Sequence, residues 1–280
     1  MASAFTVLPM SQEVFLKAGE KYGGVITVAN PADSTESFEY TVRVMPYSVV
    51  DENYRADFAT KSNQTQITDW ITIEDQTGKL EPNELKKVHF VIDVPTDAPA
   101  GGQYAVLAVA ASNNDNVKEA VNNVFEMASV IYASVEGETV HEGQIVSSSV
   151  PGFSTNTPIT SSVMLTNEGN VHEVATTTIT VKDVFRGQIF PVDGEENQFV
   201  EYIMPKSSRY LTRSIDRMAG LGIYEVEQTV EYLGGSASLT QVVIVCPIWF
   251  MILVLVTLAV GISVVIGMVK KHLRRKREVE

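Results

Sequence analysis

The sequence predicts an all-β protein with two tandem antiparallel β-sandwiches, followed by one transmembrane α-helix. Three observations lead to this prediction. Short stretches of alternating apolar and polar residues recur along most of the 280 residues, as half-buried strands require. Turn-forming Gly, Pro, Asn and Asp residues separate these stretches, with no long helical period between them. An uncharged apolar run, residues 242–269, follows near the C-terminus, and it exceeds the ~20 residues that a helix needs to cross a bilayer.

The first sandwich is predicted over residues 5–137. Polar and Pro/Gly-rich turns such as PTDAPAGG separate its strands. In residues 1–4, Ala2 and Ala4 have the small-x-small form of a signal-peptidase site, so the mature chain is expected to begin near Phe5. The expected strands are GVITVAN, FEYTVRVMPYSVV, DWITIED, KKVHFVIDVP, GGQYAVLAVAAS and VFEMASVIYASVEG.

The second sandwich is predicted over residues 138–235, and residues 236–241 are expected to form a flexible linker to the membrane. Thr, Val and Ile dominate this part, as in other strands. Tyr224 is expected to bond the backbone through its hydroxyl group, as tyrosines at sandwich corners do. The expected strands are GQIVSSSV, PITSSVMLTN, VATTTITVKDVF, GQIFPV, FVEYIMP, RYLTRSID and GIYEVEQTVEYLGG.

The predicted span, 242–269, precedes a basic tail at residues 270–280. Short loops rich in Lys and Arg stay in the cytoplasm, so the chain is predicted to be a single-pass cell-membrane protein with extracellular N-terminal domains. A tail-anchored cytosolic protein is the alternative, and its basic tail would have to cross the membrane. The expected anchor residues, at the two ends of the span and in the tail, are Pro247, Trp249, Lys270, Lys271, Arg274, Arg275, Lys276 and Arg277.

The charge distribution limits the partners. The formal net charge is −13, and the basic tail balances part of an even more acidic exterior. Such an exterior disfavours nucleic acid and anionic polymers as electrostatic partners. Cys246 is the only cysteine, so no internal disulfide can form and the sandwiches must rely on their cores.

The motifs of common active sites are missing from the sequence. No H-x-x-x-H or H-x-H pair occurs, which makes a zinc site unexpected, and there is no P-loop, dinucleotide fingerprint or G-x-S-x-G elbow. The protein is therefore predicted to be no enzyme and to need no cofactor. Asp51, Asn53 and Asp57 form a weak calcium candidate, because they offer oxygen ligands at loop-like spacing without the Gly and distal Glu of an EF-hand.

The stretch TNEGNVH raises the question of whether His172, between Glu168 and Glu173, belongs to a site. Asn167, Gly169 and Asn170 are residues that take turn or left-handed conformations. We expect His172 to pack at the start of the following strand or to bond loop backbone, and we expect the fold rather than catalysis to require this stretch.

Several stretches resemble known bacterial surface proteins. FLKAGEKYGGVITVANPADSTESFEYTVRV and WITIEDQTGKLEPNELKKVHFVIDVPTDAPAGGQYAVLAV resemble the peptidoglycan-binding-like domain of WxL-interacting proteins. NEGNVHEVATTTITVKDVFRG, MPKSSRY, GIYEVEQTVEYLGG and PIWF resemble the membrane-proximal immunoglobulin-like domain of related exported proteins. The resemblance implies immunoglobulin-like sandwiches in a Gram-positive-type envelope, wall binding and the docking of other surface proteins. No LPxTG-type motif precedes the span, so covalent attachment to the wall is not implied.

The function predicted from these observations is adhesion or docking of cell-wall or envelope-protein partners, through loops or an exposed strand edge. The alternatives are a structural subunit that forms homo-oligomers in an envelope coat or membrane complex, and a sensor that needs a membrane partner. The longest irregular stretches, VVDENYRADFATKSNQTQITDW and SNNDNVKEAVNN, supply the candidate binding residues, with core packing as the alternative for the first of them: Trp70, Tyr54, Asn114 and Asp115.

Overall fold

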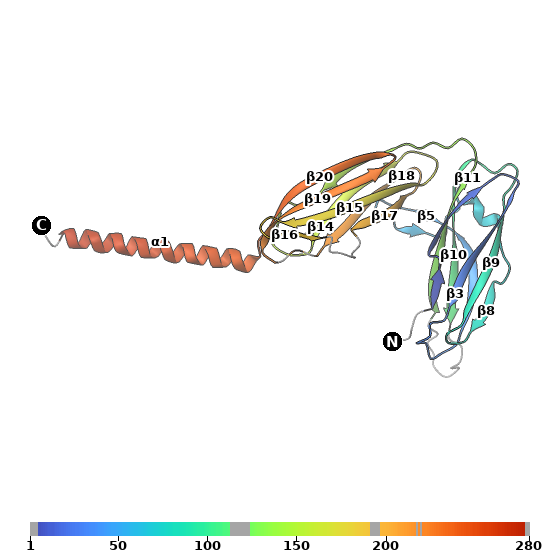
Figure 1. The fold of residues 1–280 in the computed structure, drawn as a ribbon, viewed down its shortest axis with the longest axis horizontal. Helices are drawn as coiled ribbons and strands as arrows, with labels where there is room; N and C mark the ends of the chain where they lie inside the picture. The colour runs from blue at the N-terminus through green and yellow to red at the C-terminus, as the bar shows by residue number, and fades with distance from the viewer. Residues whose placement is uncertain (1–4, 113–123, 191–196, 217, 219, 278–280) are drawn as a thin grey trace. The chain divides into compact units, whose positions relative to one another are not determined.

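A computed structural model describes residues 5–112, 124–190, 197–216, 218 and 220–277. It confirms the predicted fold class: immunoglobulin-like β-sandwiches precede a single C-terminal apolar helix (Figure 1). The elements of the first sandwich are β1 (Thr6–Leu8), β2 (Ser11–Leu16), β3 (Lys21–Ala29), β4 (Phe38–Pro46), β5 (Ser48–Val49), β6 (Ala56–Asp57), the 3-10 helix η1 (Gln66–Asp69), β7 (Ile71–Ile73), β8 (Thr77–Leu80), β9 (Leu85–Asp93), β10 (Gly101–Ser112) and β11 (Val124–Val135).

Two sheets form the first sandwich. One has the order β1-β3-β9-β7 and the other β2-β11-β10-β4-β8. The first stretch of chain is shared between them, because β1 pairs antiparallel with β3 whereas β2 pairs parallel with β11. The parallel pair departs from a purely antiparallel sandwich, and it makes β2 the end strand of the five-stranded sheet.

The core of the first sandwich lies between the two sheets. Ile26 and Phe90 from one sheet and Leu107 and Ile131 from the other are at most 1% exposed. On β3 and β9 the buried side chains alternate with more exposed ones, so the buried face sets the register of these two strands. β10 is buried along almost its whole length. Gly24 lies opposite Phe90 in the β3–β9 pair, and the Phe90 ring occupies the space beside it.

The second sandwich has the same sharing of its first strand between sheets. One sheet has the order β12-β14-β18; the other has the order β13-β20-β19-β15-β16, with β17 also paired to β15. β13 pairs parallel with β20, as β2 does with β11. The elements are β12 (Gly143–Ser149), β13 (Phe153–Ser154), β14 (Ile159–Asn167), β15 (Glu173–Asp183), β16 (Gly187–Phe190), β17 (Gln198–Ile203), β18 (Ser207–Ile215), β19 (Gly222–Tyr232), β20 (Gly235–Val245) and the helix α1 (Ile248–Arg277).

The linker predicted at 236–241 is wrong, and so is the predicted start of the span at residue 242. Residues 236–241 and the first four residues of the predicted span, 242–245, belong to β20. This strand pairs with β19 along its whole length. Leu233 and Gly234 have positive φ angles of 50° and 72°, which is the type I′ hairpin geometry that matches strand twist. The β-branched residues at 242–245 are as apolar as a membrane span requires and are equally common in strands. Composition alone therefore misplaced the boundary between β20 and the span.

The chain divides into two compact units whose limits differ from the predicted domains. The first unit holds residues 1–146, 164–175 and 201–210, and the second holds 147–163, 176–200 and 211–280. Segments that the sequence places in the second sandwich thus pack with the first. The core of the second unit includes Tyr224, Val226, Val243 and Ile179, each at most 1% exposed.

We expect Gly24→Ala to destabilise the protein and Gly23→Ala to be nearly neutral. A Cβ atom on Gly24 would lie 2.1 Å from Cζ of the buried Phe90, whereas a Cβ on the adjacent Gly23 meets nothing within 4 Å. Overpacking of this kind costs about 1–3 kcal/mol, against about 0.5 kcal/mol or less at an open site. Urea unfolding of the full chain in detergent measures both changes. Equal effects at the two glycines would contradict the packing seen here.

Candidate functional site

A row of tyrosines crosses the outer face of the five-stranded sheet. Tyr104 of β10 is the direct partner of Tyr132 on β11, and Tyr132 is the partner of Glu13 on β2. Tyr47, just after β4, meets Tyr132 edge to face, with ring centroids 6.1 Å apart. We call Tyr47, Tyr104 and Tyr132 the tyrosine row. Strand register brings these residues together although they are far apart in the sequence.

Residues of segments 164–175 and 201–210, which belong to the same unit, cover the row. Tyr202 stacks on Tyr132 at 4.3 Å between centroids, and the His172 ring lies 5.7 Å from Tyr104 and 5.3 Å from Tyr132. His172 Nε2 is 3.3 Å from a carboxylate oxygen of Glu13. Tyr104 is fully buried and the His172 side chain is 8% exposed, so the cluster is closed to solvent over most of its area.

Tyr54 and Arg209 extend the cluster on one side. The Tyr54 hydroxyl accepts a hydrogen bond from the backbone N–H of Met204 at 2.6 Å and shares one with the Ser207 hydroxyl at 2.8 Å. The Arg209 guanidinium lies 4.3 Å from the centre of the Tyr54 ring and pairs with Glu201. Tyr54 has a φ of 59°, an uncommon angle for a bulky residue, and these contacts hold it there.

Hydrogen bonds fix the TNEGN stretch, which leads directly to His172. The buried Asn167 amide donates to the carbonyls of Val171 and Ile203 at 2.8 and 2.9 Å, and Asn170 accepts from the N–H of Val140 at 2.7 Å. Gly169 has no positive φ; it is needed for space, because a Cβ would lie 2.2 Å from the Val140 carbonyl oxygen. His172 therefore packs immediately before β15, as a structural role predicts.

Burial shifts the protonation equilibria of this cluster toward the neutral forms. It raises the pKa of Tyr104 and Tyr132 and lowers the pKa of His172, the last against the opposing influence of Glu13. Neutral rings packed edge to face and stacked gain contact energy without an uncompensated charge. The chemistry of the cluster is therefore packing and hydrogen bonding, and we assign it a structural role.

The sequence-predicted binding residues lie in different places. Trp70 is 8% exposed and part of the core, so the core-packing alternative holds for it. Tyr54 is engaged in the cluster just described. Asn114 and Asp115 lie outside the described residues. The stretch around Tyr54, expected to be irregular, contains the β5–β6 hairpin and η1, which bring it against the tyrosine row.

The calcium hypothesis gains no support from the described part of the chain. The carboxylate of Asp51 accepts the backbone N–H of Asn53 at 3.0 Å, and that of Asp57 accepts the N–H of Ala59 at 2.9 Å. Hydrogen bonding to Thr60 and Ala59 lowers the pKa of Asp57. Among the described residues, no three His, Cys, Asp or Glu side chains gather as a metal site would require. The carboxylates cap their own turns.

A surface that sequence reasoning missed lies on β2. Val14 and Leu16 face the core, so Phe15 between them must face outward, and it is 82% exposed. β2 ends its sheet, and an end strand carries backbone N–H and C=O groups that no further strand pairs. The alternation in SQEVFL could have predicted this exposed Phe.

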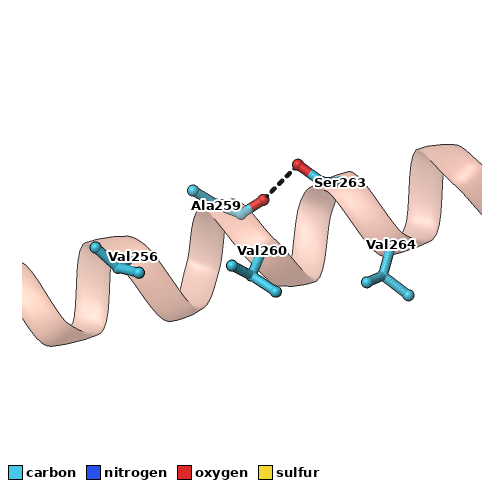
Figure 2. A pocket seen from close by; sticks show the side chains of 5 residues that line it. All are labelled: Val256, Ala259, Val260, Ser263 and Val264. Carbon is cyan, nitrogen blue, oxygen red and sulfur yellow. Dashed lines mark hydrogen bonds between the residues drawn. The ribbon is translucent and has the colours of Figure 1, made fainter.

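The helix α1 is the only described helix that is long and apolar enough to cross a membrane, over Ile248–Lys270 with a mean hydropathy of 2.9. Figure 2 shows one side of it, where the Ser263 hydroxyl donates to the Ala259 carbonyl at 2.8 Å. That bond satisfies the hydroxyl inside the helix, which removes most of the cost of exposing it to lipid. Pro247 and Trp249 lie at its start and Lys270 continues it, whereas the side chains of the remaining anchor residues lie outside the described ones: Lys271, Arg274, Arg275, Lys276 and Arg277.

We expect the cluster to weaken in acid because of His172. Its pKa is lowered from the model-peptide value of 6.5 by burial, so the unfolded state binds the proton more readily than the folded state. The stability that neutral His172 contributes is present above about pH 6.5 and is lost as the pH falls through the lower folded value. Melting temperatures of the full chain in detergent, measured from about pH 7.5 to about pH 5.5, should fall less for His172→Gln than for the wild type. Identical pH dependence of the two proteins would argue against a neutral, buried His172.

Comparisons with known proteins show the fold and neither a family nor a function. The sequence matches no protein-family model and no curated protein. Among solved structures, the class 5 fimbriae chaperone CfaA is 13% identical, with a TM-score of 0.41 over 86% of this chain and 99% of that chain. The Salmonella enterica SafA pilin–SafB chaperone complex is 14% identical, with a TM-score of 0.41 over 87% and 98% of the respective chains. The E. coli chaperone DraB is 13% identical, with a TM-score of 0.38 over 85% and 96%. None of these comparisons places the chain in a family.

Proposed function

We propose that the chain is a single-pass membrane protein whose sandwiches face the cell exterior and dock an extended segment of an envelope protein. The observation that carries the proposal is the end strand β2, whose outward-facing Phe15 is 82% exposed. Binding rather than catalysis is the proposed activity. The resemblance to WxL-interacting surface proteins points in the same direction and remains a prediction.

The helix α1 supports the proposed anchoring. Its 23-residue apolar part is ~34 Å long at ~1.5 Å per residue, which matches a bilayer core of ~30 Å with a slight tilt. The last 11 positions of the sequence, from Lys270 at the end of this part, hold six Lys and Arg residues against two Glu. By the positive-inside rule, this asymmetry keeps the C-terminus in the cytoplasm and leaves the sandwiches outside.

The geometry of β2 supports the proposed docking mode. An extended peptide that adds to an end strand gains main-chain hydrogen bonds, and its alternate side chains meet those of the strand. On β2 the outward side chains are Ser11, Glu13 and Phe15, of which Glu13 is already held by His172. Phe15 is therefore the apolar side chain that an added segment would contact, and a buried aromatic at the centre of a contact commonly carries much of its binding energy.

The charge of the exterior restricts the docked segment. The protein carries a net charge of −13 although its C-terminal tail is basic, so like-charge repulsion disfavours an acidic segment. Along the outward face of β2, Lys17 pairs with Glu136 at 3.9 Å, whereas Glu13 contacts the neutral His172 and keeps its negative charge. A neutral or basic segment with one apolar side chain opposite Phe15 fits this surface best.

We expect Phe15→Lys to abolish docking and Leu85→Lys to leave it intact. Leu85 is a matched control, since it is 64% exposed on β9, an inner strand of the other sheet. The tagged full chain in detergent is incubated with solubilised envelope of the source cells, and retained partner is quantified against the wild type. Loss of a central aromatic contact should reduce retention by about tenfold or more.

Three outcomes would overturn this proposal or part of it. Equal retention by both variants would show that β2 is not the docking surface. Retention by isolated cell wall alone, without a protein partner, would replace the protein segment with a wall polymer. A wild-type chain that forms a discrete oligomer by light scattering, without any partner, would favour the structural-subunit alternative.

A further inference from the structure

The exposed face of β20 changes from polar to apolar as the strand approaches α1. Alternate residues along this face are first Ser236, Ser238 and Thr240, and then Val242 and Ile244, which are 49% and 44% exposed. The opposite face is buried at Val243 and Val245, so the apolar residues are outside the core rather than part of it. A soluble sandwich has no need for this gradient.

The neighbouring strands continue the apolar character at the same level. Ile244 is the register partner of Phe153 on β13 and of Ile223 on β19, and Phe153 is 53% exposed. One step further from α1, Val242 is paired with Glu225, and the next pair is Thr240 with Glu227. The acidic residues of this face thus stop one step before the last row, which is apolar across three strands.

A tight turn adds two more apolar side chains to this end. The Asp183 carboxylate accepts the N–H groups of Phe185 and Arg186 at 2.8 and 2.9 Å, which fixes the turn. Phe185 is 79% exposed and Val184 is 50% exposed. The N–H of Val184 donates to the Ile223 carbonyl at 3.0 Å, so the turn lies beside the apolar row. We call Phe153, Val184, Phe185, Ile223 and Ile244 the interfacial end.

The hydrogen-bonded sheet reaches almost to the first residue of the helix. The N–H of Cys246 donates to the Ser154 carbonyl at 2.8 Å, and the Pro247 carbonyl already accepts the N–H of Phe250 at 2.9 Å. The hydrogen bonds of the sheet thus end at Cys246, and those of the helix begin at the next residue, Pro247. Two Cα steps of ~3.8 Å join Cys246 to Ile248, a distance similar to the thickness of the headgroup region on one side of a bilayer, about 5–8 Å.

We propose that the interfacial end is a second membrane contact, which lies in the headgroup region of the bilayer that α1 crosses. α1 has little apolar length to spare beyond the bilayer core, so its first turn lies at the core boundary and the end of β20 lies in or next to the headgroups. Aromatic and aliphatic side chains are favourable there. The exposed Lys182 and Arg186 are placed to meet lipid phosphates. This inference rests on the proposed membrane anchoring.

The test uses an environment-sensitive fluorophore on single cysteines in a Cys246→Ala background. Full-length protein is reconstituted into phosphatidylcholine–phosphatidylglycerol nanodiscs, with or without lipids brominated near the top of the acyl chain. Arg186→Cys places the label beside the intact Phe185. Ser236→Cys is the control at the other end of β20, ~26 Å from Ile244 along the strand at ~3.3 Å per residue. Ser263→Cys, on α1, reports insertion of the helix itself.

The expected result is blue-shifted emission and bromine quenching at position 186, at least about twofold stronger than at 236. Adding Phe185→Ser and Val184→Ser should reduce the quenching at 186 and leave that at 263 unchanged. Quenching at 263 with none at 186 would overturn the interfacial contact but keep the anchoring. No quenching at 263 would overturn the anchoring, and the further inference with it.

Discussion

Packing of the sandwich sheets against each other through their apolar faces is the constraint on which this structure depends, because no disulfide can support the fold. The only cysteine, Cys246, is free. Each strand must therefore keep its apolar face toward the core, and a slip of one residue would exchange the two faces. On β2 such a slip would expose Val14 and Leu16 and bury Glu13. This constraint also makes exposed apolar side chains informative. When the register is fixed, an apolar side chain that faces outward does not stabilise the core, so it needs another explanation.

The two sandwiches meet this constraint with the same local device. In GQY and GIY, a glycine precedes a buried tyrosine by two positions on the same face of a strand. A Cβ on Gly102 would lie 1.9 Å from the Tyr104 hydroxyl oxygen, and one on Gly222 would lie 2.5 Å from that of Tyr224. Each tyrosine lies along its strand over the glycine, so a large ring can be buried without spreading the neighbouring strands. The two rings lie in different clusters, because Tyr104 is part of the tyrosine row whereas Tyr224 is part of a sandwich core.

Local sequence patterns predicted the strands well and their partners poorly. Alternation identified most strands, and turn residues identified the breaks between them. The boundary between strand and span was misplaced at 242–245, where Val and Ile suit both structures. The hairpin turn at Leu233–Gly234 was the information that could have decided. The tyrosine row and its contact with Tyr202 were beyond local reasoning, since Tyr104 and Tyr132 meet through strand register and Tyr202 reaches them through the packing of a distant segment. The exposure of Phe15 lay within local reasoning, because the alternation in SQEVFL predicts it once residues 11–16 form a strand. The position of β2 at the end of its sheet did not.

The exposed apolar residues divide into two kinds, and the difference bears on what each contacts. Phe15 stands alone between polar neighbours on an end strand, an arrangement that suits one side chain of an added segment and exposes little apolar area without it. Residues of the interfacial end adjoin one another across β13, β19 and β20 and continue into an apolar helix. A continuous apolar surface in water would favour aggregation, whereas next to a bilayer it gains the free energy of leaving water without a protein partner. The acidic residues of β19 begin at Glu225, one row farther from α1 than this surface. That position keeps them out of the headgroup layer, whose anionic lipids would repel them. Position along β20 therefore decides which solvent each exposed side chain is suited to, water at its start and lipid headgroups at its end.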